Sequence, residues 1–122
     1  MSLSKSQLPL YAVKANLFKG LAHPFRIRIL ELLSDADEVS VADLQRELEI
    51  EASHLSQHLS VLRRHLLVES ERRGSHVFYR ICDPAVAELL AVARRLLLTL
   101  LEQDGARLAE ARDLPALRAV TE

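Results

Sequence analysis

Four leucines recur along the middle of the chain with the spacing of one helix face. Leu55, Leu59, Leu62 and Leu66 follow one another at intervals of four, three and four residues. On a helix that turns by about 100° per residue they form a single apolar stripe. The stripe predicts a helix over residues 52–65 that lays its leucines against a core.

The other side of this helix carries unusual polar residues. A helix face that is merely solvated is normally rich in Glu and Lys, which are good helix formers. Serine is only a middling helix former, but its hydroxyl and the glutamine amide both donate and accept hydrogen bonds, which suits base edges and phosphate oxygens. The residues on or beside this face are Ser53, His54, Ser56, Gln57, Ser60, Arg63 and Arg64.

The sequence on both sides predicts more helices and one β-hairpin. Apolar residues at helical spacing and prolines suited to a first turn indicate helices, whereas β-branched and aromatic runs around Gly74-Ser75 indicate two strands. The expected elements are helices over 8–22, 24–33, 41–48 and 52–65, strands over 67–73 and 76–82, and a helix from 84 to about 103.

A short helix, a turn over residues 49–51 and a second helix have helix-turn-helix geometry. The hairpin that follows is the expected wing, with its tip at Arg72-Arg73-Gly74-Ser75-His76. The predicted fold is therefore mainly α with a β-hairpin wing: a winged helix-turn-helix domain over residues 8–103. We expect a flexible N-terminus over residues 1–7 and a polar, partly helical tail over 104–122.

Charge is distributed unevenly, although the net charge of the 122-residue chain is −1. Residues 31–51 hold eight acids and one arginine, a net charge of −7. Residues 52–80 hold five arginines against Glu69 and Glu71, a net charge of +3. A local basic band can bind phosphate even on a nearly neutral molecule. Scattered surface charge is the alternative, and the charges alone do not decide between the two.

Length and composition narrow the class of protein. The chain is long enough for one modest domain. Its most apolar segment, residues 89–101, is interrupted by Arg94 and Arg95 and is too short to span a bilayer. The first residues lack the apolar run of a signal peptide. We expect a cytoplasmic, nucleoid-associated protein without a membrane partner.

Other candidate sites are weak. His54 and His58 are four residues apart, a spacing that can hold a metal, but the sequence offers no third ligand. Cys82 is the only cysteine, which excludes an intramolecular disulfide. It is either a redox-sensitive thiol or a small buried hydrophobic residue. Neither a Ser-His-Asp arrangement nor a Gly-rich phosphate loop is present, so we expect no enzyme activity and no cofactor.

The fifth helix is more apolar than one domain can bury. Packing on its own domain alone is the alternative to a partner surface, but leucines cover far more than one stripe of this helix. With apolar residues of the first helix it would form a two-fold dimer interface. The expected interface residues are Leu10, Val13, Leu17, Val86, Leu89, Leu90, Ala93, Leu97, Leu100 and Leu101.

The chain resembles the ArsR/SmtB family of small bacterial repressors over roughly residues 10–100. Phe18-Lys-Gly-Leu-Ala-His-Pro-Phe-Arg-Ile-Arg-Ile-Leu-Glu-Leu-Leu33 is similar to the family's LADPTRLRIL segment. Leu55-Ser-Gln-His-Leu-Ser-Val-Leu62 resembles its recognition-helix signature, VSxHLxxL, and Arg72-Arg73-Gly74 with Val77-Phe-Tyr-Arg80 resembles its wing. The resemblance implies a homodimer that binds an inverted-repeat operator and releases it when an effector binds.

The family's familiar effector sites are where the sequence departs. Its thiolate motif ELCVCDL corresponds to Glu38-Val-Ser-Val-Ala-Asp-Leu44, so Ser40 and Ala42 replace both cysteines and cannot hold a soft metal. The fifth helix has no histidine, and relatives that sense persulfide need two cysteines. We therefore expect no metal, and the effector is unknown. The alternative function is a winged-helix interaction or dimerisation module without a small-molecule effector.

The expected roles on DNA follow from the fold. Two copies of helix 52–65 would enter successive major grooves, about 34 Å apart. Ser53, His54 and Gln57, near the helix start, are the candidates for base contacts. The remaining residues would meet phosphates or, from the wing, the flanking backbone or minor groove. These are Ser56, Ser60, Arg63 and Arg64 on the helix, and Arg72, Arg73 and His76 on the wing.

Overall fold

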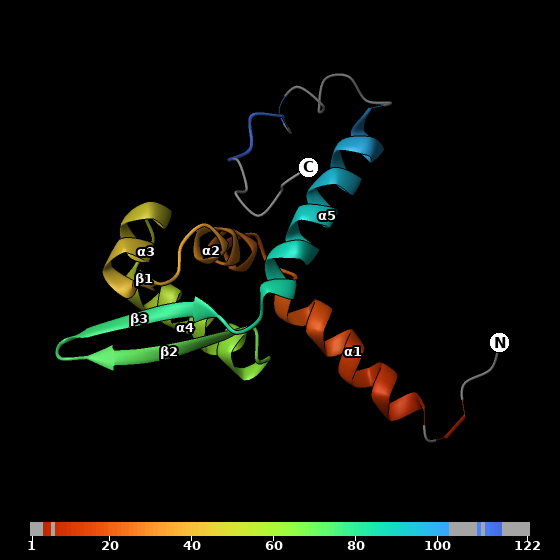
Figure 1. Cartoon of the computed structure of the whole chain (residues 1–122), viewed down its shortest axis with the longest axis horizontal. Coiled ribbons are helices and arrows are strands. Elements are labelled where there is room, and N and C mark those ends of the chain that lie inside the picture. The colour runs from red at the N-terminus through yellow and green to blue at the C-terminus, as the bar shows by residue number, and fades with distance from the viewer. Residues whose placement is uncertain (1–3, 6, 103–109, 111, 116–122) are drawn as a thin grey trace.

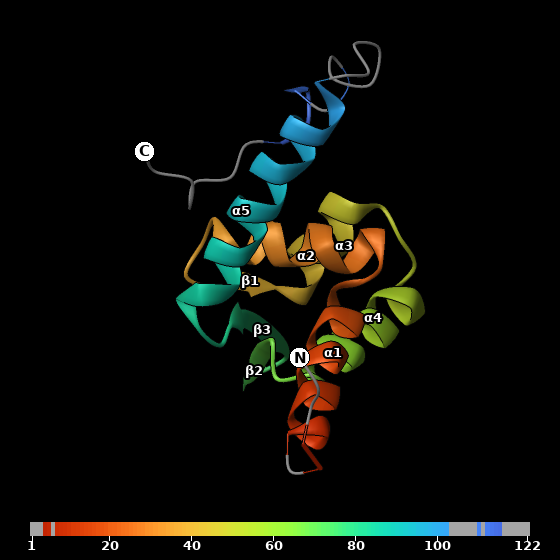
Figure 2. The same ribbon diagram turned by 90° about the vertical axis from the view of Figure 1, so that its right-hand side faces the viewer.

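Five helices and a small sheet make up the fold of the computed structural model, which describes residues 4–5, 7–102, 110 and 112–115. The body, formed by α2, α3, α4 and the sheet, extends a hairpin on one side, while α1 and α5 diverge from the other (Figures 1 and 2). The elements are α1 (Leu8–Leu21), α2 (Pro24–Ser34), β1 (Val39–Ser40), α3 (Val41–Leu48), α4 (Ala52–Arg64), β2 (Val68–Arg73), β3 (His76–Ile81) and α5 (Pro84–Leu101). The predicted winged helix-turn-helix is confirmed.

Leucines from four helices form the core. Leu55, Leu59 and Leu62 of α4 are buried, as the stripe predicts. Burial of a leucine side chain is worth about 1.5–3 kcal/mol, so the stripe is a main contribution to the position of α4. The other buried members of the cluster are Ile29, Leu30, Leu33, Leu44, Leu67, Val68, Tyr79, Val86 and Leu90.

The sheet has three strands in the order β1-β3-β2, all antiparallel. The hairpin register pairs Arg73 with His76, and Gly74 occupies the turn with φ +65°. This left-handed backbone favours glycine at the wing tip. The sequence predicted the hairpin but not β1, because two residues are too few to show the alternation of a strand.

Side-chain caps start two of the helices at their prolines. His23 Nδ1 accepts a hydrogen bond from the amide of Phe25 (3.1 Å) at the start of α2. Asp83 Oδ1 accepts one from the amide of Ala85 (2.8 Å) at the start of α5. Both boundaries are those predicted, since proline fits the first turn and the preceding side chain can satisfy a free amide. Glu51 precedes α4 without a side-chain cap.

One residue expected in the core is exposed. Leu66 was the last member of the leucine stripe, but α4 ends at Arg64 and Leu66 adopts a left-handed backbone with φ 61°. Its side chain is 78% exposed because the chain has left the helical path.

The chain termini are described only in part. Of the predicted tail over 104–122, only Glu110 and residues 112–115 lie within the described residues. There Arg94 of α5 donates hydrogen bonds to the carbonyls of Leu114 (2.8 Å) and Pro115. Of the predicted N-terminus, the amide of Ser4 donates to Gln7 Oε1 (3.0 Å). None of the helices in the described ranges is long and apolar enough to cross a membrane.

Candidate nucleic-acid interface

The helix-turn-helix consists of α3, a short turn and α4. Ser40 caps α3 by accepting a hydrogen bond from the amide of Asp43 (3.1 Å). Glu49 then takes a left-handed conformation (φ 52°, ψ 44°) at the end of α3, which turns the chain sharply toward α4. Leu44 of α3 and Leu55 of α4 are both fully buried in the common core. The outer face of α4 is therefore held in a fixed orientation.

Every side chain predicted to meet DNA is exposed, while the leucines between them on α4 are buried. This separation puts a continuous polar surface on α4 and the adjoining wing. Neither face is mixed, so the exposed surface can approach a duplex without disturbing the core. The ten exposed residues are Ser53, His54, Ser56, Gln57, Ser60, Arg63, Arg64, Arg72, Arg73 and His76.

His58 differs from its exposed neighbours on α4 because it is half-buried and its ring packs against two other rings. Its ring centroid lies 4.3 Å from that of His23 and 5.7 Å from that of Phe25. Burial, followed by the positive charges of His23, Arg26 and His54, lowers the pKa of His58. His58 was not among the residues predicted to contact DNA.

The two arginines of the wing are not equivalent. Arg73 forms ion pairs with Glu38 and with Glu71 (3.8 Å), and its guanidinium lies 3.9 Å from the centroid of the Phe78 ring. The guanidinium of Arg72 has no ion-pair or hydrogen-bond partner in the part of the chain that the structure describes. A free guanidinium is available to a phosphate, whereas Arg73 would first have to leave its carboxylates.

Further polar contacts connect α4 to the wing and neutralise part of it. Arg63 Nη1 donates to Ser70 Oγ of β2 (3.4 Å), and Arg80 of β3 forms ion pairs with Glu69 (2.8 Å) and Glu71 (3.3 Å). These hydrogen bonds raise the pKa of Arg80. The sequence analysis predicted none of these three contacts. Pairing the strands outward from Gly74-Ser75 would have placed Glu69 opposite Arg80 and revealed their ion pair.

The residues considered for metal and thiol chemistry have other contacts in the structure. Ser40, which replaces a family cysteine, uses its hydroxyl to cap α3. Among the described residues no three His, Cys, Asp or Glu side chains form a metal-binding group. Cys82 is exposed, so the interpretation as a buried hydrophobic residue is wrong. Its thiol donates to the carbonyl of Leu66 (2.6 Å), and partial burial raises its pKa.

Apolar side chains are exposed along the two terminal helices. Of the predicted interface residues, Leu10, Val13, Ala93, Leu97 and Leu100 are exposed, and Leu17, Leu89 and Leu101 are half-buried. Val86 and Leu90 belong to the chain's own core, because they lie on the side of α5 that packs against the domain. Phe18, Val92 and Leu96 add exposed apolar surface that the prediction left out.

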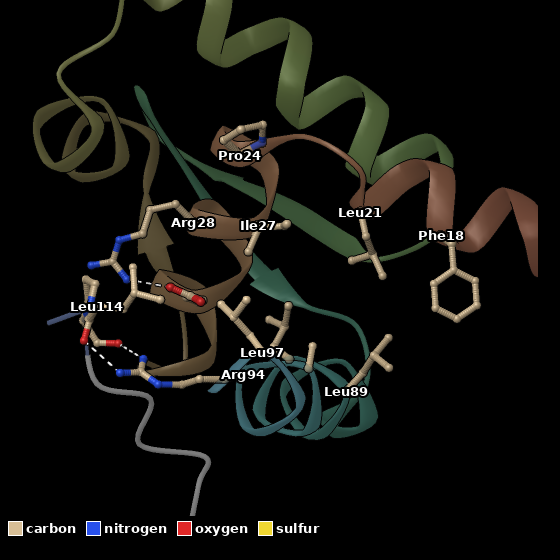
Figure 3. A pocket seen from close by; sticks show the side chains of 13 residues that line it. Phe18, Leu21, Pro24, Ile27, Arg28, Leu89, Arg94, Leu97 and Leu114 are labelled. Carbon is tan, nitrogen blue, oxygen red and sulfur yellow. Dashed lines mark hydrogen bonds and ion pairs between the residues drawn. The ribbon is translucent and has the colours of Figure 1, made fainter. Parts of the chain in front are cut away.

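An apolar recess of about 380 Å³ lies where α1, α2 and α5 meet (Figure 3). Phe18 and Leu21 line it from α1, Ile27 from α2, and Leu89 and Leu97 from α5. The ion pair between Arg28 and Glu31 (3.1 Å) and the guanidinium of Arg94 stand at its polar end. The recess is continuous with the exposed leucines of α5, so it forms part of the same apolar surface.

Comparison with known proteins identifies relatives over most of the chain. Residues 21–71 match a family model described as a helix-turn-helix domain. The HTH-type transcriptional regulator Rv0081 of Mycobacterium tuberculosis is 48% identical over 104 residues, 85% of this chain and 91% of the relative. The transcriptional activator HlyU of Vibrio cholerae is 39% identical over 80 residues, 66% of this chain and 73% of the relative.

Solved structures have the same fold. The crystal structure of Rv0081 superimposes with a TM-score of 0.72 at 49% identity and covers 79% of this chain and 96% of that one. The homodimeric winged helix-turn-helix DNA-binding domain of Mb0332 from Mycobacterium bovis, a possible ArsR-family regulator, gives 0.74 at 29% identity, over 84% of this chain and 94% of that one.

These relatives are transcriptional regulators rather than enzymes, and the winged helix-turn-helix structure of Mb0332 has the fold of this chain. The chain therefore belongs to the ArsR/SmtB family of winged helix-turn-helix transcriptional regulators.

Proposed function

We propose that this regulator binds an inverted-repeat operator as a homodimer, with one α4 in each of two successive major grooves. The observation that carries the proposal is the division of α4 into a buried leucine face and an exposed face of hydroxyls, an amide and arginines. A two-fold dimer matches a palindromic site, with half-sites about one helical turn apart.

The start of α4 is the proposed base-reading segment. Ser53, His54 and Gln57 are exposed on its first turns. A glutamine amide can make a bidentate contact with adenine, and a serine hydroxyl can contact any base. Glutamine is therefore the residue proposed to contribute most to sequence preference.

Phosphate contacts are assigned to the rest of α4 and to the wing. Ser56, Ser60 and Arg64 are exposed farther along or beside the reading face. Arg63, through Ser70, connects α4 to the wing, so both would approach the backbone together. On the wing, Arg72 is the principal contact and His76 a second one; Arg73 contributes less because Glu38 and Glu71 already hold its guanidinium. These contacts set register and affinity rather than sequence preference.

The exposed apolar surface of α1 and α5 is proposed as the dimer interface. Leu10 and Val13 of α1 and Leu100 of α5 each expose more than half of their side chains. Exposed apolar side chains gathered on a helix in this way mark protein interfaces. The recess beside Leu89 and Leu97 is open in one copy, and a side chain from the partner would fill it. The homodimeric relative Mb0332 supports this assembly.

Repression is the proposed direction of regulation, and an unidentified signal would end it. A dimer on an operator that overlaps a promoter blocks access of the polymerase. The family resemblance supports repression, whereas HlyU of Vibrio cholerae is named an activator. A promoter fused to a reporter decides between them: repression predicts that expression rises when the regulator is deleted. The protein would act in the cytoplasm, on the nucleoid.

Selection of bound sequences from a random DNA pool tests the proposal. The enriched sequences should contain two inverted half-sites spaced by about 10–10.5 base pairs, centre to centre. Binding should weaken steeply as salt is raised, because neutralised phosphates release counterions. Repeating the selection with metals, thiol oxidants and metabolites would show whether an effector acts. A pool without enrichment would contradict the proposal and favour an interaction module.

A further inference from the structure

A cluster of aromatic rings joins α4 to the start of α2. The rings of His23 and His58 lie 4.3 Å apart between centroids, at 46°, and Phe25 stands 5.9 Å from His23 and 5.7 Å from His58. His58 projects from the middle of α4, and His23 is the residue that caps α2. These rings make a direct contact between the DNA-reading helix and the α1–α2 junction.

The same junction is tied to α1. Arg26 donates from Nε to the carbonyl of Gly20 (2.8 Å) and from Nη2 to that of Lys19 (3.2 Å). At the other end of α4, His65 packs so closely on Gly20 that a β-carbon there would lie 2.9 Å from its ring. The helix proposed for DNA reading and the helix proposed for dimerisation therefore meet at these contacts.

Hydrogen bonding requires one of the two histidines to keep a bare nitrogen. His23 Nδ1 accepts from the amide of Phe25 (3.1 Å). A nitrogen that accepts a hydrogen bond carries no proton, so the hydrogen bond assigns the neutral ring its proton at Nε2. Protonation of Nδ1 would remove this helix cap.

The charges around His58 also favour a neutral ring. The charged groups that face it are His23 from the α1–α2 junction, Arg26 from α2 and His54 from the preceding turn of α4. All are cationic when ionised, and no acid acts on it among the described residues. Together with burial they lower the pKa of His58. The packed arrangement is therefore favoured above the ordinary histidine pKa of 6.5 and loses stability as the pH falls through and below that value.

We propose that His58 is a positioning residue rather than a DNA contact: while neutral, it anchors α4 to the α1–α2 junction through His23, and protonation of the pair in acid weakens operator binding. The inference rests on the proposed function, because it assigns DNA reading to α4. It predicts that a regulator of this build binds DNA less well as its surroundings acidify.

The test compares operator affinity at about pH 8 and about pH 5.5, on either side of the histidine pKa. Fluorescence anisotropy with the selected duplex, at one ionic strength, gives the ratio of the two dissociation constants. Any other effect of acid on DNA binding is common to the unsubstituted protein and to the variants. The informative quantity is therefore the difference between this ratio in the unsubstituted protein and in each variant.

Two variants each remove one histidine of the pair and keep one of its contacts. His58→Phe keeps an aromatic ring, and His23→Asn keeps a side chain able to cap α2. Both should bind at about pH 8 and lose less affinity in acid than the unsubstituted protein. Arg95→Ala is the control, because Arg95 is exposed on α5 and lies outside the ring cluster; its acid loss should equal that of the unsubstituted protein.

The possible outcomes are distinct. If the ratio of dissociation constants in both His58→Phe and His23→Asn equals that of the unsubstituted protein, and circular dichroism shows that both are folded, the inference is overturned. The proposed function would remain intact. Failure of the unsubstituted protein to bind any duplex at about pH 8 would instead contradict the proposed function. In a supporting result, NMR titration of the imidazole signals would also place the His58 transition below that of an exposed histidine.

Discussion

Helices α4 and α5 are built alike on their inner sides and oppositely on their outer sides. Both bury leucines against the same core, Leu59 from α4 and Leu90 from α5. The exposed side of α4 presents polar residues such as Gln57, whereas that of α5 presents Leu96 and Leu100, which are 56% and 66% exposed. The inner sides hold the fold together, and the outer sides differ in the kind of partner they can accept.

The amount of surface that a helix exposes therefore does not indicate what that surface binds. Exposure to water costs a hydroxyl, an amide or a guanidinium little free energy, and each can form hydrogen bonds with a DNA duplex. Exposure of leucines to water is unfavourable, and burial against a partner protein removes this cost. Substitutions on the inner and outer sides of the two helices and on the wing test this division.

The largest effect is expected where two leucines of the same predicted stripe have different surroundings. Leu62→Ala removes a fully buried side chain of α4 and should lower the free energy of unfolding by about 2–5 kcal/mol. Leu66→Ala removes a side chain that is mostly exposed and should change it by less than about 0.5 kcal/mol. Urea denaturation measures both. Equal losses would mean that Leu66 completes the stripe after all.

The next effect concerns the outer side of α5. Leu100→Glu places a charge in the proposed dimer interface and should weaken dimerisation by about 2 kcal/mol or more, because an unpaired charge would be buried there. Light scattering coupled to size exclusion should show monomers at concentrations where the unsubstituted protein is dimeric. Arg95→Glu adds a glutamate on the polar side of the same helix and should stay dimeric. Dimers in both variants would contradict the interface.

The outer side of α4 should respond through DNA rather than through assembly. Gln57→Ala should reduce affinity for the selected operator by about 1–3 kcal/mol, because a bidentate base contact is lost. Affinity for a scrambled duplex should not change, which makes the scrambled sequence the internal control in a mobility-shift titration. An equal loss on both duplexes would reassign Gln57 from base reading to the backbone.

The smallest effect separates the two wing arginines. Arg72→Ala should weaken binding to all sequences alike and reduce the salt dependence by about one phosphate contact. Arg73→Ala should reduce the salt dependence less, because the Arg73 guanidinium is already paired with Glu38. Arg95→Ala, on α5, is the matched control and should leave the salt slope unchanged. Equal slopes for the two wing variants would show that DNA displaces the ion pair of Arg73.

Much of this architecture could be predicted because its signals are local. The leucine period, the Pro24 and Pro84 starts and the Gly74 turn each depend on a few adjacent residues, and they located the helices and the hairpin. Strand β1 could not be predicted in this way. Its two residues become a strand only because Val39 pairs with Tyr79, far along the sequence.

The candidate site was predictable in its faces but not in its contacts. Periodicity identified which residues of α4 point outward, and all of those chosen are exposed. It could not show that Arg73 meets Glu38, or that His58 meets His23, because these pairs come from different elements. The prediction for Leu66 was wrong for a related reason. The position at which a helix ends depends on backbone geometry, which the spacing of side chains does not record.

The most direct test of the division between α4 and α5 is an NMR titration of the labelled dimer with the selected operator. We predict that amide signals of Ser53, His54, Gln57 and the wing around Arg72 shift strongly, while those of the exposed α5 stripe, including Leu96 and Leu100, change little. Strong shifts along the α5 stripe with an unperturbed α4 would contradict the assignment of α4 to DNA and α5 to the partner subunit.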